Sequence, residues 1–181
     1  DTDEELAYVD SIVDVRNYME YVAIQSFTGN TDLLNVKRYR NSNGDGRWRW
    51  ILFDMDWAFN EDTNSARRWI NPDGAGSGNK TNNKLFVALM KNEKFFDEYC
   101  TFMGQMMATD WSTESVLSLI KERYDELLPE MPAHLARWNV SESQFNSSMK
   151  KFTKYAETRP AKMLGYMQES YGLTDEQMQR Y

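Results

Sequence analysis

The chain has 181 residues, of which 41% are hydrophobic and 14% aromatic, so it can form one domain with a substantial core. Its 21 basic and 28 acidic residues give a net charge of −7, which argues against a general nucleic-acid-binding protein. The single cysteine, Cys100, excludes an intrachain disulfide, and with the single histidine, His134, it cannot form a Cys/His zinc site. No apolar run approaches the roughly 20 residues of a membrane span, and no signal peptide is visible.

The N-terminal part predicts a frayed acidic start over residues 1–5 and then one amphipathic helix. Apolar residues recur at three- and four-residue spacing over residues 15–28, which is typical of a helix with one buried face. Asp14 suits the N-cap of this helix. Gly29 suits its C-terminal end, because glycine readily adopts the left-handed conformation found there.

A β-hairpin is predicted next. Residues 36–39 and 47–53 are typical of two short strands, and residues 41–46 between them are rich in Asn, Gly and Asp, which form turns. The second strand is expected to lead directly into Asp54 and Asp56. Residues 60–83 predict a long loop, and long loops inside compact domains are often functional or mobile.

From residue 83 onward the pattern is helical almost to the end of the chain. The caps and breakers that bound the first four predicted helices are Asn92, Ser112, Pro129, Pro132 and Ser141. Pro160 is assigned to the first turn of a fifth helix that ends near Gly172. Thr174 with Gln177 resembles a capping box for a short last helix. The predicted fold class is α+β, mostly α-helical, with one hairpin.

Asp54 and Asp56 are the first candidates for chemistry. Side chains alternate along an extended strand, so both carboxylates would fall on one side and repel each other unless a cation lies between them. Mg²⁺ suits such a pair, since it takes oxygen ligands and keeps water or substrate phosphates in the rest of its shell. The alternative is that both acids only cap a turn at the strand end.

Asp32 and Asn35 lie in the loop before the hairpin. Because a hairpin returns its second strand beside its first, these two residues are expected near Asp54 and Asp56. An Asp and an Asn, then a hairpin, then an Asp after an apolar strand is the order found in protein kinases. There these residues position the acceptor hydroxyl and hold Mg²⁺ on the nucleotide.

At these residues the sequence resembles the CotH kinase family, that is, spore coat protein H and its relatives. The resemblance covers residues 10–173 and rests on several blocks that occur in a fixed order. The blocks are Asp14-Val15 through Tyr21, Gly29-Asn30-Thr31-Asp32, Asn35-Val36-Lys37-Arg38-Tyr39-Arg40, Trp48 through Phe59 with its Asp54-Met55-Asp56-Trp57 core, residues 130–138, and Arg159-Pro160.

The resemblance implies an atypical protein kinase that transfers phosphate from ATP to Ser or other hydroxyls of a protein substrate, with Mg²⁺ or Mn²⁺. Asp32 matches the catalytic-loop acid of that family. Asn35 matches the metal-binding amide of the loop, and Asp54 the later metal-binding acid. Asp56 is the second acid of the same motif and is counted with the metal ligands.

The same resemblance implies a C-terminal kinase lobe over residues 1–173, with residues 174–181 as a short helix or tail. No Gly-rich loop and no lysine precede Lys37, so the N-terminal lobe that covers the nucleotide phosphates is absent from this chain. The chain also does not begin with Met. We therefore expect either a fragment that is inactive alone and belongs to a longer kinase, or a shortened relative without kinase activity.

Other features have structural explanations that we favour over functional ones. Residues 41–46 match the first positions of an EF-hand Ca²⁺ loop, but Leu52 occupies the place of its last acid, so a tight turn is the better interpretation. Trp48, Trp50 and Trp57 could stack on sugars, although packing against helices is the more common fate of such residues. His134 is more typical of a hydrogen-bonded structural residue, and Cys100 of a buried small hydrophobe.

Two functional hypotheses follow. The first is the C-terminal lobe of a CotH-like kinase acting on a protein substrate. The second is a non-catalytic kinase-like module that binds or assembles with a protein or glycan at a bacterial cell or spore surface. The compartment stays open, with the cell surface, secretion and the spore coat all compatible with the resemblance.

Overall fold

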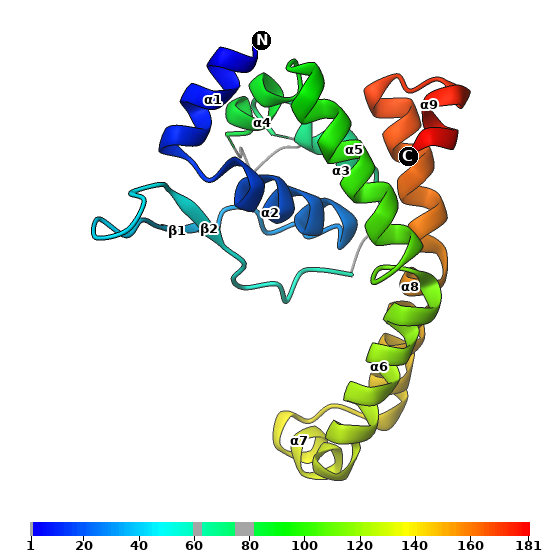
Figure 1. Cartoon of the computed structure of the whole chain (residues 1–181). Helices are drawn as coiled ribbons and strands as arrows, with labels where there is room; N and C mark the ends of the chain where they lie inside the picture. Colours follow the sequence, from blue (N-terminus) through cyan, green and yellow to red (C-terminus); the bar gives the residue numbers. More distant parts are fainter. Residues whose placement is uncertain (1, 60–62, 75–81) are drawn as a thin grey trace.

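The computed structural model describes residues 2–59, 63–74 and 82–181 (Figure 1). It is mostly helical with one two-stranded antiparallel sheet, which confirms the α+β class. Its elements are α1 (Asp3–Ile12), α2 (Val15–Phe27), β1 (Lys37–Tyr39), β2 (Arg49–Ile51), α3 (Ser65–Trp69), α4 (Lys84–Leu89), α5 (Glu93–Ala108), α6 (Thr113–Leu127), the 3₁₀ helix η1 (Leu128–Glu130), α7 (Met131–Trp138), α8 (Glu142–Tyr171) and α9 (Asp175–Arg180).

The acidic N-terminal segment forms a helix, so the prediction of a frayed start was wrong. Thr2 and Glu5 form a capping box at the start of α1, in which each side chain bonds the backbone N–H of the other residue. This reciprocal pair satisfies two of the backbone donors that a helix leaves open at its N-terminus. Three acids in the first turn also interact favourably with the positive end of the helix dipole.

Helix α2 forms where the amphipathic pattern predicted a helix, and it lies at the centre of the fold. The Asp14 carboxylate accepts a hydrogen bond from the backbone N–H of Asn17 and caps the helix at its N-terminus. Gly29 follows the C-terminal end with a φ of 61°, in the left-handed region. The buried face of α2, which includes Met19 and Val22, contacts α3, α5 and α8 around one core.

The hairpin has the predicted topology but shorter strands. Arg38 pairs with Trp50 in the antiparallel register of β1 and β2. The outer edge of β2 is held against the start of α2, because the Asn17 side chain bonds both the N–H and the carbonyl of Trp50, at 2.7 and 3.3 Å. Among the described residues, β1 pairs with β2 alone, so its outer edge is open.

The segment predicted as one long loop contains a short helix, α3. Its N-cap is Asn64, whose side chain accepts from the N–H of Arg67. Ala66 and Trp69 are buried in the core, which explains why this polar stretch is ordered. Residues 60–62 and 75–81 of this predicted loop lie outside the described residues.

Helix α8 is continuous through Pro160, so the predicted break before a fifth helix was wrong. Proline lacks the N–H that would bond the Ala156 carbonyl one turn earlier. Thr113, at the start of α6, donates its hydroxyl toward the carbonyls of Ala156 and Glu157 at 3.5 and 3.4 Å. A side chain from a neighbouring helix therefore replaces the donor that the proline removes.

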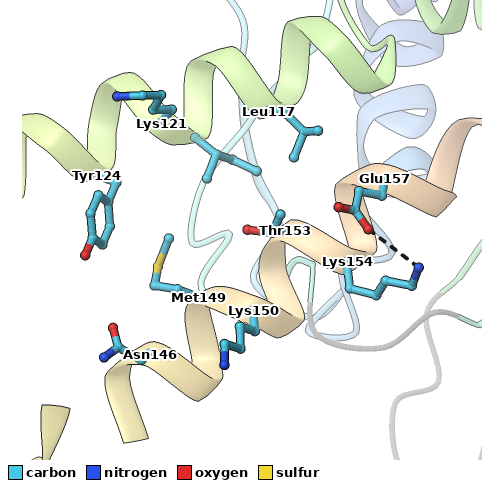
Figure 2. A pocket seen from close by; sticks show the side chains of 10 residues that line it. Leu117, Lys121, Tyr124, Asn146, Met149, Lys150, Thr153, Lys154 and Glu157 are labelled. Carbon is cyan, nitrogen blue, oxygen red and sulfur yellow. Dashed lines mark ion pairs between the residues drawn. The ribbon is translucent and has the colours of Figure 1, made fainter. Parts of the chain in front are cut away.

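Helices α6 and α7 and the N-terminal half of α8 project from the body as an arm, with α7 at its tip (Figure 1). Neither α6 nor α7 contains a buried residue. The facing sides of α6 and α8 enclose a groove of about 640 Å³, into which Tyr124 and Met149 project (Figure 2). The arm is therefore held by half-buried contacts rather than by a core of its own.

Candidate active site

Three of the four predicted site residues meet at the base of the hairpin. The Asn35 side-chain amide donates to Oδ2 of Asp32 and to Oδ2 of Asp54, each at 2.9 Å. Asp32 and Asn35 come from the loop after α2, and Asp54 comes from the segment after β2. The amide group therefore links two carboxylates that lie 22 positions apart in the sequence and would otherwise repel.

Asp56 is not part of this linked group. The strand that was expected to carry both acids ends at Ile51, and Asp54 adopts a φ of 54°, in the left-handed region. Strand alternation therefore does not govern the two carboxylates, and Asp56 lies exposed in the turn that follows. Among the described residues, no three Asp, Glu, His or Cys side chains converge closely enough to form a metal site.

The backbone at Asp54 is unusual for a residue with a side chain. A positive φ costs a non-glycine residue free energy, and such residues cluster at binding and catalytic sites. Phe59, a few residues later, has a φ of 58°, and its N–H donates to the Thr28 carbonyl at 2.8 Å. The segment that carries Asp54 and Asp56 is thus tied at its far end to the C-terminal turn of α2.

Asn30 holds the Asp32 loop in place, and sequence reasoning gave it no role of its own. Only 1% of its surface is exposed. Its amide donates to the side-chain oxygen of Gln25 at 2.9 Å, and its oxygen accepts from the N–H of Asp32 at 3.1 Å. The same amide nitrogen lies 3.5 Å from the sulfur of Met55. One buried side chain therefore contacts both segments that supply the site.

Two arginines hold the surrounding backbone. Arg68 donates to the Asn30 carbonyl at 2.8 Å. Arg159 is fully buried and donates to the carbonyls of Phe27 and Ser26, each at 2.7 Å, and to that of Thr63 at 3.1 Å. Its positive charge lies at the carbonyl end of α2, where the helix dipole is negative, so the placement is favourable.

The turn of the hairpin has no free carboxylate for Ca²⁺. Hydrogen bonds from Arg49 and then from Arg47 hold the pKa of the Asp45 carboxyl well below its usual range. Arg49 also pairs with Asp14 at 2.9 Å, and Arg47 with Asp10 at 3.0 Å. This ion-pair cluster fastens the hairpin to α1 and α2, which agrees with the structural interpretation of the turn.

The linked group offers ligands that fit Mg²⁺ or Mn²⁺. Asp32 and Asp54 supply carboxylate oxygens, and the Asn35 amide supplies one more oxygen once it rotates that atom toward a cation. In the present arrangement the Asn35 amide directs its NH₂ group toward both acids. This orientation is expected because carboxylates accept hydrogen bonds and the NH₂ group donates them. The group is exposed, so a cation could retain water or phosphate oxygens in its shell.

The remaining candidates lie apart from this group. His134 belongs to α7 at the tip of the arm. Cys100 is fully buried, and burial raises the pKa of its thiol to about 12, as suits an inert core residue. Trp50 packs on Tyr18 with ring centroids 4.5 Å apart, whereas Trp48 and Trp57 remain 38% and 53% exposed.

Within the described residues, no helix is long and apolar enough to cross a membrane.

A family model described as CotH kinase protein matches residues 1–163. The chain belongs to the CotH kinase family. The matched segment includes Asp32, Asn35, Asp54 and Asp56 and ends inside α8. No curated protein and no solved structure matches the chain significantly. Membership in the CotH family indicates a kinase-like function at a coarse level.

Proposed function

We propose that this chain is the C-terminal lobe of a CotH kinase domain and that the domain transfers the γ-phosphate of ATP to a hydroxyl group of a protein. The observation that supports the proposal most directly is the Asn35 amide, which links Asp32 and Asp54 at 2.9 Å each. An acid, an amide and a second acid in one exposed group match three of the side chains that protein kinases use for phosphoryl transfer.

Each side chain has a distinct task in this proposal. Asp32 orients the acceptor hydroxyl and takes its proton as the oxygen attacks phosphorus. Asn35 and Asp54 hold a divalent cation, and Asp56, in the turn after Asp54, contributes to its shell through a water molecule. When bound, the cation neutralises charge on the nucleotide phosphates. The contacts of Asn30 and Arg68 keep the loop rigid, which matters because phosphoryl transfer depends on positioning.

The proposal is tested by phosphate transfer. The protein, including any residues that precede this chain in its gene, is incubated with γ-labelled ATP, Mg²⁺ or Mn²⁺ and a mixture of protein acceptors. We expect label transfer by the wild type and none by Asp32→Asn or Asp54→Ala, each with an unchanged melting temperature. Asp110→Asn, an exposed acid outside the site, serves as the matched control and should keep full activity. Transfer by Asp54→Ala at the wild-type rate would overturn the proposal.

A second candidate function is a non-catalytic binding module, and the arm favours it. Its helices and their connections expose large apolar side chains, among them Leu119, Leu127 and Trp138, at 54%, 57% and 62%. Exposed apolar residues gathered on one projecting element are typical of a contact surface. Capture of a partner that is lost in Leu127→Asp and retained in Asp54→Ala would support this function, and the reverse pattern would exclude it.

A further inference from the structure

A second groove lies beside the candidate active site, on the side of the hairpin that faces α2. Its volume is about 1030 Å³, slightly more than the roughly 1,000 Å³ of the largest typical small-molecule sites. Leu34 and Val36 form one wall. Asn35, between these two residues in the chain, instead contacts Asp32 and Asp54. Within this loop, therefore, Asn35 contacts the two carboxylates of the candidate active site, whereas its neighbours Leu34 and Val36 line the groove.

The lining combines aromatic rings with positive charge. Trp48, Trp50 and Trp69 contribute rings, and Arg38 and Lys84 contribute the charged groups. Among the described residues that line the groove, none is an Asp or a Glu. This composition contrasts with the chain as a whole, which has a net charge of −7. A positive groove in an acidic protein favours an anionic occupant.

The Arg38 side chain is positioned where it can contact an anionic occupant. Its guanidinium lies 5.7 Å from the centre of the Trp50 ring, directly across the β1–β2 register, which limits the conformations of its long side chain. Within the described part of the chain it forms no ion pair, and neither does Lys84. Of the acids around the hairpin, Asp10, Asp14 and Asp45 pair with Arg47 and Arg49, and Asp32 and Asp54 accept hydrogen bonds from Asn35. The positive charges of Arg38 and Lys84 are therefore available to pair with an anionic ligand in the groove.

The open edge of β1 adds a way to bind a peptide backbone. Its strand partner, β2, is fastened to α2 on its far side, whereas the outer N–H and C=O groups of β1 have no strand beside them among the described residues. An extended peptide can add to such an edge through main-chain hydrogen bonds. β1 begins two residues after Asn35, so a peptide placed there would run toward Asp32.

We propose that this groove binds an acidic, extended segment of the protein acceptor and thereby selects acceptor hydroxyls flanked by Asp and Glu. Arg38 and Lys84 contact the acidic side chains, and the rings of Trp48 and Trp50 cover the aliphatic parts of the segment. The claim that the bound segment is a phosphate acceptor rests on the proposed kinase function. Binding of an acidic segment in the groove does not depend on catalysis.

The test measures the binding of three labelled 15-residue peptides by fluorescence anisotropy. Each peptide has one central serine, flanked by Asp and Glu, by Asn and Gln, or by Lys. We expect the acidic peptide to bind at least tenfold more tightly than the other two, and more weakly at high salt because the contacts are ionic. Equal affinity for all three peptides would overturn the inference.

Charge-reversal variants test whether the acidic peptide binds in this groove. The double variant Arg38→Glu with Lys84→Glu should lose at least tenfold in affinity for the acidic peptide and gain affinity for the lysine peptide. The matched control, Lys91→Glu with Lys94→Glu, makes the same charge change at exposed positions outside the groove and should stay within twofold of the wild type. An equal loss in both double variants would overturn the inference, because it would reflect net charge alone.

Competition separates a peptide site from other anion sites. Displacement of the acidic peptide by ATP, or by polygalacturonate at equal charge concentration, would overturn the inference in favour of a nucleotide or glycan site. The measurement is repeated in Asp54→Ala, where binding should persist. If the acidic peptide binds but the longer protein transfers phosphate to no acceptor, the proposed kinase function fails and the groove remains. If phosphate is transferred without preference for acidic acceptors, the groove inference fails and the kinase function remains.

Discussion

Arg159 donates from Nε to the carbonyl oxygen of Phe27 at 2.7 Å, across 132 positions of the sequence. This bond joins the long helix α8 to the last turn of α2, from which the loop with Asp32 begins. The Tyr155 hydroxyl donates to the same carbonyl at 3.0 Å. The C-terminal part of the chain thus fixes the backbone that leads into the candidate active site.

Replacement of Arg159 should destabilise the whole fold. Arg159→Lys keeps a positive charge but cannot reproduce the forked contacts to Phe27 and Ser26. Because buried hydrogen bonds from a charged donor contribute about 1.5–3 kcal/mol each, we expect the free energy of unfolding to fall by about 3 kcal/mol. Urea denaturation measures this change. Lys151→Met, at an exposed position of the same helix, should change it by less than about 0.5 kcal/mol, and an equal effect of both variants would contradict the assigned role.

Asn30→Ala should affect both stability and phosphate transfer. The substitution leaves Gln25 and the N–H of Asp32 without their buried partner, at a cost of about 1–3 kcal/mol by urea denaturation. Because a misplacement of about 1 Å can cost about 100-fold in rate, transfer activity should fall by that order. Asn41→Ala removes an exposed turn asparagine of the hairpin and should leave the rate unchanged. Full activity in Asn30→Ala would show that the loop holds its position without this residue.

Thr113 and Pro160 should be energetically coupled. Pro160→Ala restores the N–H that bonds the Ala156 carbonyl, so the unfolding free energy should rise by about 2 kcal/mol. Thr113→Val should cost about 1 kcal/mol in the wild type and nearly nothing in Pro160→Ala, where the carbonyl already has a donor. A double-mutant cycle followed by urea unfolding measures the difference, and strictly additive effects would refute the coupling.

Alkaline pH should weaken the fold through Cys100. The thiol has a pKa of about 12 in the native protein because of burial and then of the Asp97 charge, against an ordinary value of 9.0. Between these values the unfolded chain loses the proton that the native chain keeps, so stability falls as pH rises through this window. Cys100→Ala should show a shallower decline in melting temperature over the same window. The native thiol should also react with thiol reagents at pH 8 far more slowly than in urea.

The local elements could be predicted where the signal is itself local. Asp14, Asn92, Ser112, Ser141 and Thr174 cap helices as their residue types indicated, because an N-cap bond spans only three residues. The first turn of α1 was missed although its capping box is equally local, since a short acidic stretch at a chain end has little apolar periodicity. Helix α3 was missed because the burial of Trp69 and Ala66 comes from distant segments.

The candidate site was only partly predictable for a similar reason. The sequence order of Asp32, Asn35 and Asp54 around a hairpin indicated that they would meet, and the structure brings these three together. The place of Asp56 was not predictable from strand alternation, because the positive φ of Asp54 interrupts the strand conformation before it. The contribution of Asn30 was hidden as well, since its partners Gln25 and Met55 become its neighbours only when the chain folds.

The sequence by itself determined the class of the fold, the hairpin and the membership in the CotH kinase family, because these depend on periodicity, turn residues and ordered motifs. The tertiary structure decided what those motifs can do. It placed one amide between two carboxylates, and it supplied the Ala156 carbonyl in α8 with a hydroxyl donor from α6 in place of the N–H that Pro160 lacks. It also assembled a positive, aromatic groove in an acidic chain. Each of these arrangements joins segments far apart in the sequence, so only the packing of the folded chain specifies them.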